Sequence, residues 1–443
     1  MTGRGPRSPV LGLYQIAGRA LSPLVPALLA RRAARGKEDP ARLDERLGHA
    51  RRPRPEGPLV WLHGASVGES LSLLPVAEGL MARRPDLAVL VTSGTVASAE
   101  MMGQRLPPRA LHHYAPVDTP AAAARFIAHW RPDLCVFVES DLWPNLLDAA
   151  RSRGARTALV SARLSPGSLR GWGRAAAAAL RVLGGFDLVM AQDQALADGL
   201  ATLGARKDGL LNLKLAGAPL PVDETARLVE AERLDGRPLL LAASTHPGED
   251  EIVLDAFAPL AARDDRPLLV IAPRHPVRGE AVTALARGRG FATARRSGSE
   301  AVSPATQVLV ADTLGELGLW FSLARLALVA GSLVPKVGGH NPLEPARLGC
   351  PFAAGPQVDN WRGVYDALAP GEGFVSVADA AALSAAWTAA LDHPAEALVR
   401  AHRAAALAAD GAQALDAALD RLAALLPPPP PPPPPPSGAE AAA

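Results

Sequence analysis

The chain has 443 residues, of which 49% are hydrophobic and 20% are charged, a composition that fits a globular protein. This length exceeds what one hydrophobic core usually holds, so we expect two domains of roughly 150 to 200 residues each. The only cysteines, Cys135 and Cys350, lie in opposite halves, which argues against a disulfide framework or a metal cluster and favours a reducing compartment.

Basic residues concentrate at the start of the chain. Residues 1–58 hold 12 Lys and Arg against 5 Asp and Glu, a local charge of +7, which leaves −5 for the rest of a chain whose total is +2. We assign residues 1–50 to a basic, membrane-anchoring N-terminal segment.

An apolar run at residues 10–30 has Arg19 as its only charged residue, and the basic stretch RRAARGK comes directly after it. Its length matches the roughly 20 residues of a bilayer span, but one glutamine and two prolines weaken that interpretation. A spanning helix, an interfacial helix and a buried packing helix all remain open. If the run spans a membrane, the basic residues after it favour a cytoplasmic position for the remainder of the chain, although Arg4 and Arg7 favour the opposite orientation.

Short apolar runs alternate with longer alanine-rich segments along the rest of the chain. This alternation predicts parallel sheets, and its restart after a break predicts two Rossmann-like doubly wound α/β domains rather than one wide sheet. The predicted strands begin near residues 59, 87, 134, 157 and 187, and then near 238, 267, 306 and 326.

The sequence GAPLPVDETARL breaks the strand pattern with glycine and prolines. We therefore predict a first domain at 51–216, a linker at 217–237, a second domain at 238–426 and a disordered polyproline tail at 427–443. We expect a cleft between the domains. Ligands of open parallel sheets bind beyond the carboxyl ends of the strands, so residues directly after the strands are the candidates for chemistry.

In the first domain, HGASVGES follows one predicted strand and ESDLWPNLL follows another. Glu69 would stabilise a helix start through the helix dipole, and taken alone that is its more probable role. Glu139 and Asp141 add a second acidic strand end facing the same cleft. Acidic residues after two strands that face one cleft favour a functional site over helix capping as their only role.

In the second domain, APRHP places Arg274 at a strand end, where its planar guanidinium could meet a phosphate. Gly315 and Glu316 stand at a predicted helix start. Asn341 and Glu344 form a cap-like arrangement at another, behind a glycine pair that could seat a phosphate, with a carboxylate available for ribose hydroxyls.

Neither the dinucleotide-binding GxGxxG pattern nor the P-loop pattern occurs in a strand-turn-helix context, which argues against a dehydrogenase or a P-loop enzyme. Four histidines near strand ends lack the spacing of metal ligands, so we favour hydrogen-bonding roles for them. They are His63, His246, His275 and His340.

Taken in order, the motifs resemble the Kdo transferases, glycosyltransferases of lipopolysaccharide assembly that move 3-deoxy-D-manno-octulosonate (Kdo) from CMP-Kdo to a lipid A precursor. The resemblance extends from about residue 10 to about residue 425. It is carried by SVGES, ESDLWPNLL, SARLSPGS, LNLK, STHPGEDE, APRHP, DTLGEL and GSLVPKVGGHNPLEPARLG.

The resemblance implies a GT-B fold, in which the first domain faces the acceptor and the second holds the nucleotide. It also implies that Glu69 is the general base and that Glu139 and Lys214 support the transition state. The nucleotide-binding residues that it implies are Pro273, Arg274, Gly315, Glu316, Leu317, Asn341, Pro342, Leu343 and Glu344.

The partners that the resemblance implies are CMP-Kdo, a lipid A precursor and an anionic membrane surface, with no cofactor, no metal and no nucleic acid. The expected location is the cytoplasmic face of the inner membrane. This sequence departs from the family pattern at Asp141, where a second glutamate is common, and at Ala330, where a glycine is typical.

Two alternatives remain open from the residues. One is another two-domain nucleotide-sugar enzyme, such as a UDP-GlcNAc epimerase or a UDP-sugar transferase. The other is a catalytically silent membrane scaffold, in which Glu69 would be only a helix-start residue.

Overall fold

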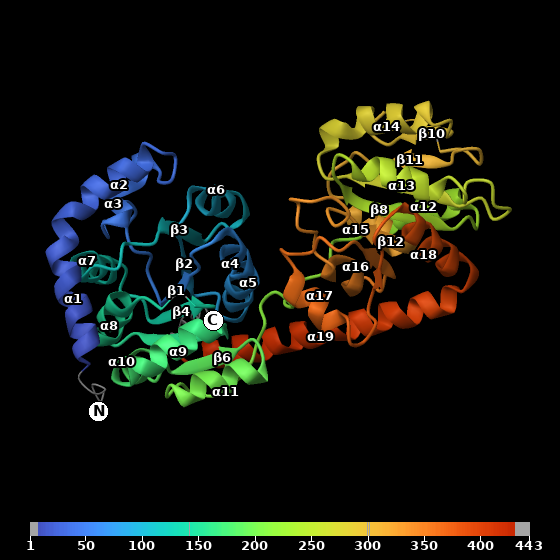
Figure 1. Ribbon diagram of the computed structural model, residues 1–443. Helices are drawn as coiled ribbons and strands as arrows, with labels where there is room; N and C mark the ends of the chain where they lie inside the picture. The colour runs from blue at the N-terminus through green and yellow to red at the C-terminus, as the bar shows by residue number, and fades with distance from the viewer. Residues whose placement is uncertain (1–7, 141, 299, 301, 430–443) are drawn as a thin grey trace, which may run out of the picture. The chain divides into compact units, whose positions relative to one another are not determined.

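In the computed structural model, which describes residues 8–140, 142–298, 300 and 302–429, the chain divides into two compact units. Unit 1 is formed by the chain up to Ala216 together with the stretch from Gln413, and unit 2 runs from Gly217 to Ala412. Each unit has one seven-stranded sheet covered by helices (Figure 1). This confirms the predicted α/β class with two doubly wound domains.

The sheet of unit 1 is parallel throughout, in the order β3-β2-β1-β4-β5-β6-β7. Strand β1 pairs with β2 on one side and β4 on the other, so the chain builds the sheet outward in opposite directions from the centre. The strands are β1 (Leu59–His63), β2 (Ala88–Ser93), β3 (Ala110–Tyr114), β4 (Leu134–Val138), β5 (Arg156–Ala162), β6 (Leu188–Ala191) and β7 (Gly209–Leu210).

The central strands are buried on both faces, as expected where helices cover both faces of a parallel sheet. Alternation along β1 sends Leu59 and Trp61 into one core cluster and Val60 and Leu62 into the other. Fully buried strands leave no room for ligands along their length. Polar chemistry is therefore restricted to the loops that come after them.

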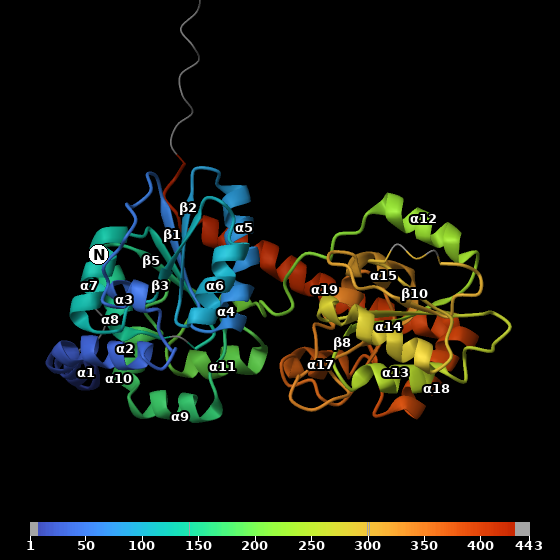
Figure 2. The same ribbon diagram turned by 90° about the horizontal axis from the view of Figure 1, so that it is seen from above.

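Helices α4, α5 and α6 cover one face of this sheet, and α7, α8 and α10 cover the other (Figure 2). Helix α3 (Leu43–Arg46) comes before β1, and the helices of unit 1 between the strands are α4 (Val67–Ser72), α5 (Leu74–Arg83), α6 (Val96–Arg105), α7 (Pro120–Trp130), α8 (Pro144–Ser152), α9 (Pro166–Arg174), α10 (Ala176–Val182) and α11 (Gln194–Thr202).

The apolar N-terminal run folds as two helices, α1 (Pro9–Leu21) and α2 (Val25–Ala33), joined by a 3-10 turn (Ser22–Leu24). One side packs on unit 1, where the hydroxyl of Tyr14 donates to Asp118 Oδ2 over 2.9 Å. The opposite side exposes large apolar side chains: Val10, Leu13, Ile16, Leu21, Leu24 and Leu28. Within the described ranges, no helix combines the length and the apolar character that a membrane crossing requires.

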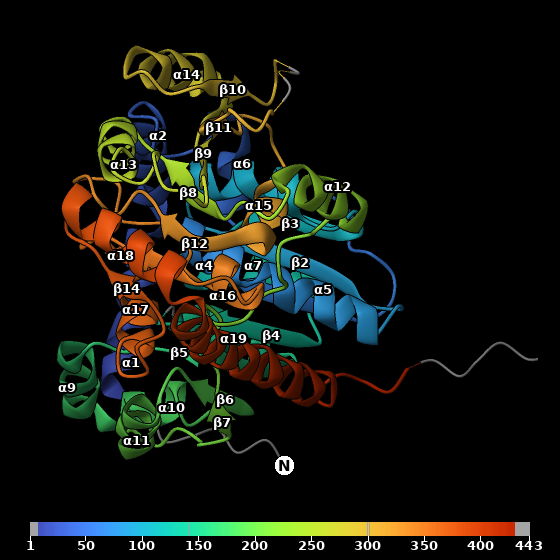
Figure 3. The ribbon, with the colours of Figure 1, turned by 90° about the vertical axis from the view of Figure 1, so that its right-hand side faces the viewer.

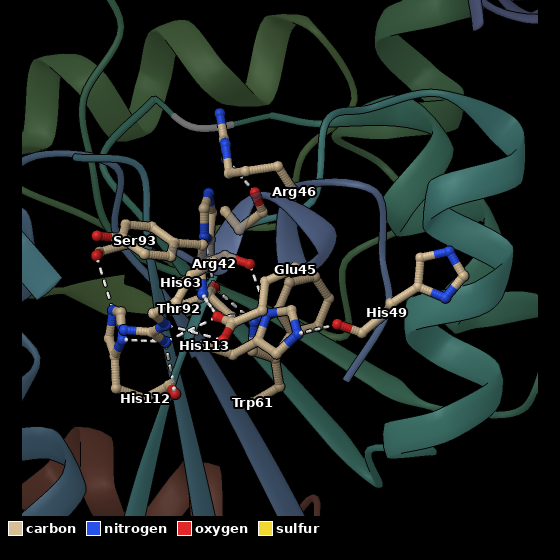
Figure 4. Close-up of polar contacts among 12 residues, drawn as sticks. Arg42, Glu45, Arg46, His49, Trp61, His63, Thr92, Ser93, His112 and His113 are labelled. Atoms are coloured by element: carbon tan, nitrogen blue, oxygen red, sulfur yellow. Dashed lines mark hydrogen bonds and ion pairs between the residues drawn. The ribbon is translucent and has the colours of Figure 1, made fainter. Parts of the chain in front are cut away.

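A buried carboxylate ties the segment after α2 to the sheet. Glu45 of α3 accepts hydrogen bonds from the amide of Tyr114 and from Arg42, whose guanidinium also contacts His112 (Figure 4). Burial raises the pKa of Glu45, but these bonds outweigh it and lower the pKa overall. The carboxylate therefore stays ionised and holds α3 against the edge of the sheet formed by β3.

The sheet of unit 2 is also parallel, in the order β10-β11-β9-β8-β12-β13-β14 (Figure 3). Its strands are β8 (Leu239–Thr245), β9 (Leu268–Pro273), β10 (Thr293–Arg295), β11 (Val308–Val310), β12 (Ala324–Val329), β13 (Phe352–Ala354) and β14 (Val375–Ser376). Its helices are α12 (Glu224–Leu234), α13 (Glu249–Phe257), α14 (Gly279–Gly288), α15 (Leu317–Leu323), α16 (Leu343–Arg347), α17 (Arg362–Leu368) and α18 (Ala380–Asp392).

The long helix α19 (Pro394–Ala423) starts in unit 2 and ends on unit 1. Leu419 and Leu422 join the core cluster formed with α5, and Arg83 of α5 bonds Asp416 and Asp420. The last residue of unit 2, Ala412, therefore lies before the domain end at 426 that the sequence predicts, because the end of α19 is apolar on the face that meets α5. The predicted disordered tail lies outside the described residues from 430 onward.

We predict that Leu419→Ala destabilises unit 1 by about 2 to 4 kcal/mol, because it leaves a cavity beside Gly79 of α5, which packs directly on the Leu419 side chain. Leu398→Ala, on an exposed stretch of the same helix, should cost less than about 0.5 kcal/mol. Hydrogen exchange of the β1 and β2 amides reports on unit 1 specifically. Equal protection in both variants would contradict the docking of α19.

Candidate active site

Both sheets reverse their strand order at one point, between β1 and β4 in unit 1 and between β8 and β12 in unit 2. At such a point the loops after two adjacent strands run in opposite directions, which leaves a crevice at the carboxyl ends of the strands. In unit 1 these two loops carry Glu69 and Glu139. In unit 2 they carry His246 and His340, and Arg274 comes after the next strand, β9.

Glu69 occupies the third position of α4 and forms a reciprocal capping box with Ser66. Its Oε1 accepts from the Ser66 hydroxyl over 2.8 Å, while the amide of Glu69 donates to Ser66 Oγ over 3.3 Å. Its Oε2 accepts from the amide of Ala65 over 2.8 Å. Glu69 and Ser66 therefore cap the start of α4, as the sequence predicts. A carboxylate has about four lone-pair sites, so these bonds orient the group without using its full acceptor capacity.

Glu139 lies directly after β4 with a positive φ of 53°, a conformation that is costly for a residue with a side chain. The burial of this half-buried carboxyl raises its pKa, the Lys214 ammonium opposes that rise, and the Glu69 carboxylate adds to it. The structure thus brings both Glu69 and Lys214 within electrostatic reach of Glu139.

Lys214 comes from the segment after β7, far along the sheet from Glu139. The hydroxyl of Ser161, a second residue with positive φ (51°), accepts hydrogen bonds from the Leu213 amide and the Gln192 side chain over 3.2 Å each. This contact holds the turn that presents Lys214, whose amide donates to Asn212 Oδ1 over 3.1 Å.

A buried imidazole joins the two loops of the unit 1 crevice. The indole N–H of Trp143, in the loop after β4, donates to His63 Nε2 over 3.0 Å. His63 Nδ1 lies 2.8 Å from Thr92 Oγ1, which also accepts from Trp61 (Figure 4). Since Nε2 accepts, Nδ1 carries the proton of the neutral ring. Neither His63 nor Trp143 was singled out from the sequence as a site residue, because their contact depends on the tertiary structure.

Arg274 lies directly after β9 and is exposed, and no hydrogen bond or ion pair joins its guanidinium to any other described residue. Its backbone is fixed, since the Arg274 amide donates to the Thr245 carbonyl over 3.0 Å. The guanidinium is therefore free to bind an anion, whereas the nearby Arg278 is paired with the buried Asp250.

Gly315, Glu316 and Leu317 form the start of α15, as predicted. Gly315 has a φ of 85° and open space where a side chain would stand. The Glu316 carboxylate is already bound by Arg296, at 2.8 Å, and by Thr313. This segment can therefore bind a ligand through its backbone groups, but not through the Glu316 carboxylate.

Asn341, Pro342, Leu343 and Glu344 lie together at the start of α16. Asn341 Oδ1 accepts from the Leu343 amide over 3.0 Å, a local bond at the start of α16, whose N-cap residue is Pro342. Burial raises the pKa of Glu344, and the Arg274 and Arg347 charges and a hydrogen bond with Asn341 oppose that rise. The structure therefore places the Glu344 carboxylate near Arg274, with Pro273 at the end of β9 beside them.

Elsewhere in unit 1, a cavity of about 1290 Å³ lies at the amino ends of the strands, where Asp133, Arg156 and Asp187 line it. Parallel sheets bind ligands at the carboxyl ends of their strands, so this cavity at the amino ends is not the candidate site. In the part of the chain that the structure describes, no group of three or more His, Cys, Asp or Glu side chains is arranged to hold a metal ion.

The comparisons with known proteins agree with these motifs. Residues 41–216 match the family described as 3-Deoxy-D-manno-octulosonic-acid transferase (kdotransferase). A 3-deoxy-D-manno-octulosonic acid transferase of Bordetella pertussis is 35% identical over 377 residues, which cover 81% of this chain and 86% of that protein. The chain belongs to the Kdo transferase family. It is therefore a glycosyltransferase.

A second family member, the 3-deoxy-D-manno-octulosonic acid transferase of Haemophilus influenzae, is 33% identical over 76% of this chain and 80% of its own length. Among solved structures, a glycosyltransferase from Rickettsia africae ESF-5 covers 84% of the chain and 99% of its own at a TM-score of 0.52 and 11% identity. That likeness concerns the fold alone, and it agrees with the GT-B type expected for a Kdo transferase.

The site residues predicted for this Kdo transferase thus form two groups, one at the crevice of each sheet. Asp141, the second acidic residue of ESDLWPNLL, lies outside the described residues. The structure adds His63 and Trp143 in unit 1, and it adds Glu249 and the histidines of the second crevice in unit 2. The histidines at strand ends were visible in the sequence, but their partners were not.

We predict that His63 makes the Kdo transferase sensitive to acid. Burial lowers the pKa of His63 to about 4, whereas the unfolded chain binds a proton near pH 6.5. Between these values the unfolded state binds more protons, so the free energy of unfolding falls as the pH falls. From pH 7.5 to 5.0 the wild type should lose about 2 kcal/mol more than His63→Gln, measured by urea unfolding. Equal losses would show that His63 is not held neutral.

Proposed function

We propose that this chain is an inverting glycosyltransferase that moves Kdo from CMP-Kdo to a lipid A precursor during lipopolysaccharide assembly. The observation that carries the proposal is the grouping of Glu69 and Glu139, which follow the central strands β1 and β4, with Lys214 from the segment after β7. In a glycosyltransferase, this is where an acceptor hydroxyl has to lose its proton.

Glu69 is the proposed general base. A sugar hydroxyl is a weak nucleophile until a base takes its proton, and such help is worth roughly 10² to 10⁴ in rate. The hydrogen bonds from Ser66 and Ala65 support this role, because they fix the carboxylate and leave lone pairs for the acceptor. The Glu69 carboxylate carries out both functions, capping α4 and accepting the proton.

Glu139 and Lys214 are the proposed transition-state groups. An oxocarbenium-like centre develops positive charge while the departing phosphate develops negative charge. A carboxylate and an ammonium that already interact can meet both charges without reorganising. The strained backbone of Glu139 supports a functional role, because such conformations concentrate at active sites.

Unit 2 is the proposed donor site. The free guanidinium of Arg274 would bind the phosphate of CMP, with the backbone of Gly315 to Leu317 beside it, and the buried carboxylate of Glu344 would accept from ribose hydroxyls. In this proposal Arg274 offsets the charge of the departing nucleotide and no metal or other cofactor is required.

We also propose that the catalytic units lie at the cytoplasmic face of the inner membrane. The exposed apolar side of α1 and α2 would enter the interface of the bilayer, and the basic residues after α2 would attract anionic headgroups by about 1 kcal/mol each. This arrangement would bring the enzyme to a phosphorylated glycolipid acceptor.

We predict that Arg274→Ala weakens the binding of CMP by about 1.5 to 3 kcal/mol, the usual cost of losing a charge-assisted contact. Titration calorimetry with CMP measures this change. Arg325→Ala is a matched control, because Arg325 is an exposed arginine near the start of β12, at the amino ends of the strands and so away from the proposed site. Unchanged affinity in Arg274→Ala would remove Arg274 from the donor site.

We predict that Glu69→Gln lowers Kdo transfer by roughly 10² or more while the binding of CMP stays normal, because an amide cannot take the acceptor's proton. A residue that only caps a helix would shift stability by about 0.3 to 1 kcal/mol and leave turnover intact. Glu78→Gln, on the exposed side of α5, controls for loss of a surface charge. Near wild-type transfer by Glu69→Gln would reduce Glu69 to a capping residue.

A further inference from the structure

Two histidines meet across the crevice of unit 2. His246 lies after β8, His340 lies in the loop after β12, and their Nε2 atoms are 2.9 Å apart. The ring planes differ by 17° and the ring centroids are 5.1 Å apart. Since the nitrogens are much closer than the centroids, the rings meet edge to edge and nearly coplanar. This is the geometry of an N–H···N hydrogen bond between two imidazoles.

Each neutral imidazole has one N–H, so one ring of this pair donates and the other accepts. When His340 Nε2 donates, the N–H of the neutral His246 ring lies at Nδ1. Among the described residues, the Nδ1 atom of His246 has no hydrogen-bond partner.

The backbone around the pair is built to hold it. Ser244, two residues before His246, has a φ of 61° at a point where the pairing of β8 with β9 shifts register. Gly331 has a φ of 71°, and a Cβ there would lie 2.9 Å from the His340 ring. Only glycine allows the ring to approach the backbone this closely.

One buried carboxylate clamps the two loops that carry the histidines. Glu249 is fully buried and accepts from the amide of His246 over 3.0 Å and from the amide of Gly331 over 2.7 Å. Its other oxygen accepts from the amides of Ser332 and Leu333 over 3.0 Å each. The loops after β8 and β12 are therefore fixed to each other, and the open nitrogen of His246 has a defined position.

The surroundings of this nitrogen favour an anion. Burial lowers the pKa of His246, the Glu249 carboxylate opposes that fall, and the charges of His275, Arg278 and Arg274 add to it. The His275 ring is 6.1 Å from that of His246. The carboxylates nearby are engaged, since Glu249 binds four amides and Asp250 is paired with Arg278. Glu344 is the other nearby carboxylate, and it interacts with Arg274, Arg347 and Asn341.

A nucleotide-linked sugar acid brings two anions to such a site, one phosphate and one carboxylate. Arg274 matches the phosphate. We propose that the Nδ1 edge of His246 binds the carboxylate of the transferred sugar acid, and that His340 is a positioning residue that fixes the His246 ring. Binding requires an N–H at Nδ1, which the neutral His246 ring supplies when its Nε2 accepts from His340. This inference rests on the proposed function.

The test separates the carboxylate from the nucleotide. His246→Gln keeps a polar group near the Nε2 position but loses the Nδ1 edge, whereas the amide of Asn in His246→Asn imitates Nδ1. We expect His246→Gln to raise the KM for CMP-Kdo about tenfold and His246→Asn to raise it less than threefold, with the Kd of CMP within twofold of wild type in both. His393→Gln, at the end of α18, is the control for an exposed histidine of the same unit.

His340→Gln tests the positioning role and should raise the KM for CMP-Kdo more than it changes the Kd of CMP. A parallel loss of CMP affinity in His246→Gln would assign His246 to the phosphate or to the fold and overturn the inference. An unchanged KM in that variant would overturn it as well. If the wild-type enzyme bound CMP but did not turn over CMP-Kdo with a lipid A precursor, the proposed function itself would fail.

Discussion

The reversal of strand order at the centre of each sheet is the constraint on which the rest of the structure depends. Parallel strands buried on both faces cannot accommodate ligands along their length, so chemistry moves to the loops after the strands. Between β1 and β4, and again between β8 and β12, those loops separate and open a crevice. The candidate acid and base groups of unit 1 and the candidate anion-binding groups of unit 2 stand at these two positions.

Both crevices hold their loops by the same means. In each, a neutral histidine at a strand end bonds a side chain from the opposite loop, Trp143 in unit 1 and His340 in unit 2. A carboxylate fixes the loops further, Glu69 at the start of α4 in unit 1 and the buried Glu249 in unit 2, and each accepts from backbone amides. Charged groups that lack such partners, Arg274 above all, are left for the substrate. Rigid neutral supports around a few free charges are what electrostatic catalysis requires.

The sequence allowed the central strands and the two-domain class to be predicted, because β1, β4, β8 and β9 are continuous apolar runs. It did not predict β3, because this edge strand is only partly buried and contains two adjacent histidines in place of an apolar run. Arg42 contacts His112, and Glu45 lies close to His113. The two-residue strands β7 and β14 are too short to leave a pattern. The return of α19 to unit 1 depends on contacts with α5, more than three hundred residues earlier.

The site could be predicted one residue at a time but not as an arrangement. The rule that ligands bind after parallel strands selected Glu69, Glu139 and Arg274 individually, and the family motifs supplied their roles. The capping box of Glu69 could be inferred from local sequence. The pairs His63 with Trp143 and His246 with His340 could not, because each joins loops that are at least 80 residues apart.

The central claim is that this chain transfers Kdo from CMP-Kdo to a lipid A precursor. Mass spectrometry of the lipid A precursor after incubation with the purified enzyme and CMP-Kdo tests it most directly, with UDP-sugars supplied in parallel reactions. We expect the precursor to gain mass in whole Kdo increments with CMP-Kdo and to remain unchanged with UDP-sugars. An unmodified precursor in the presence of CMP-Kdo, or modification by a UDP-sugar, would contradict the account.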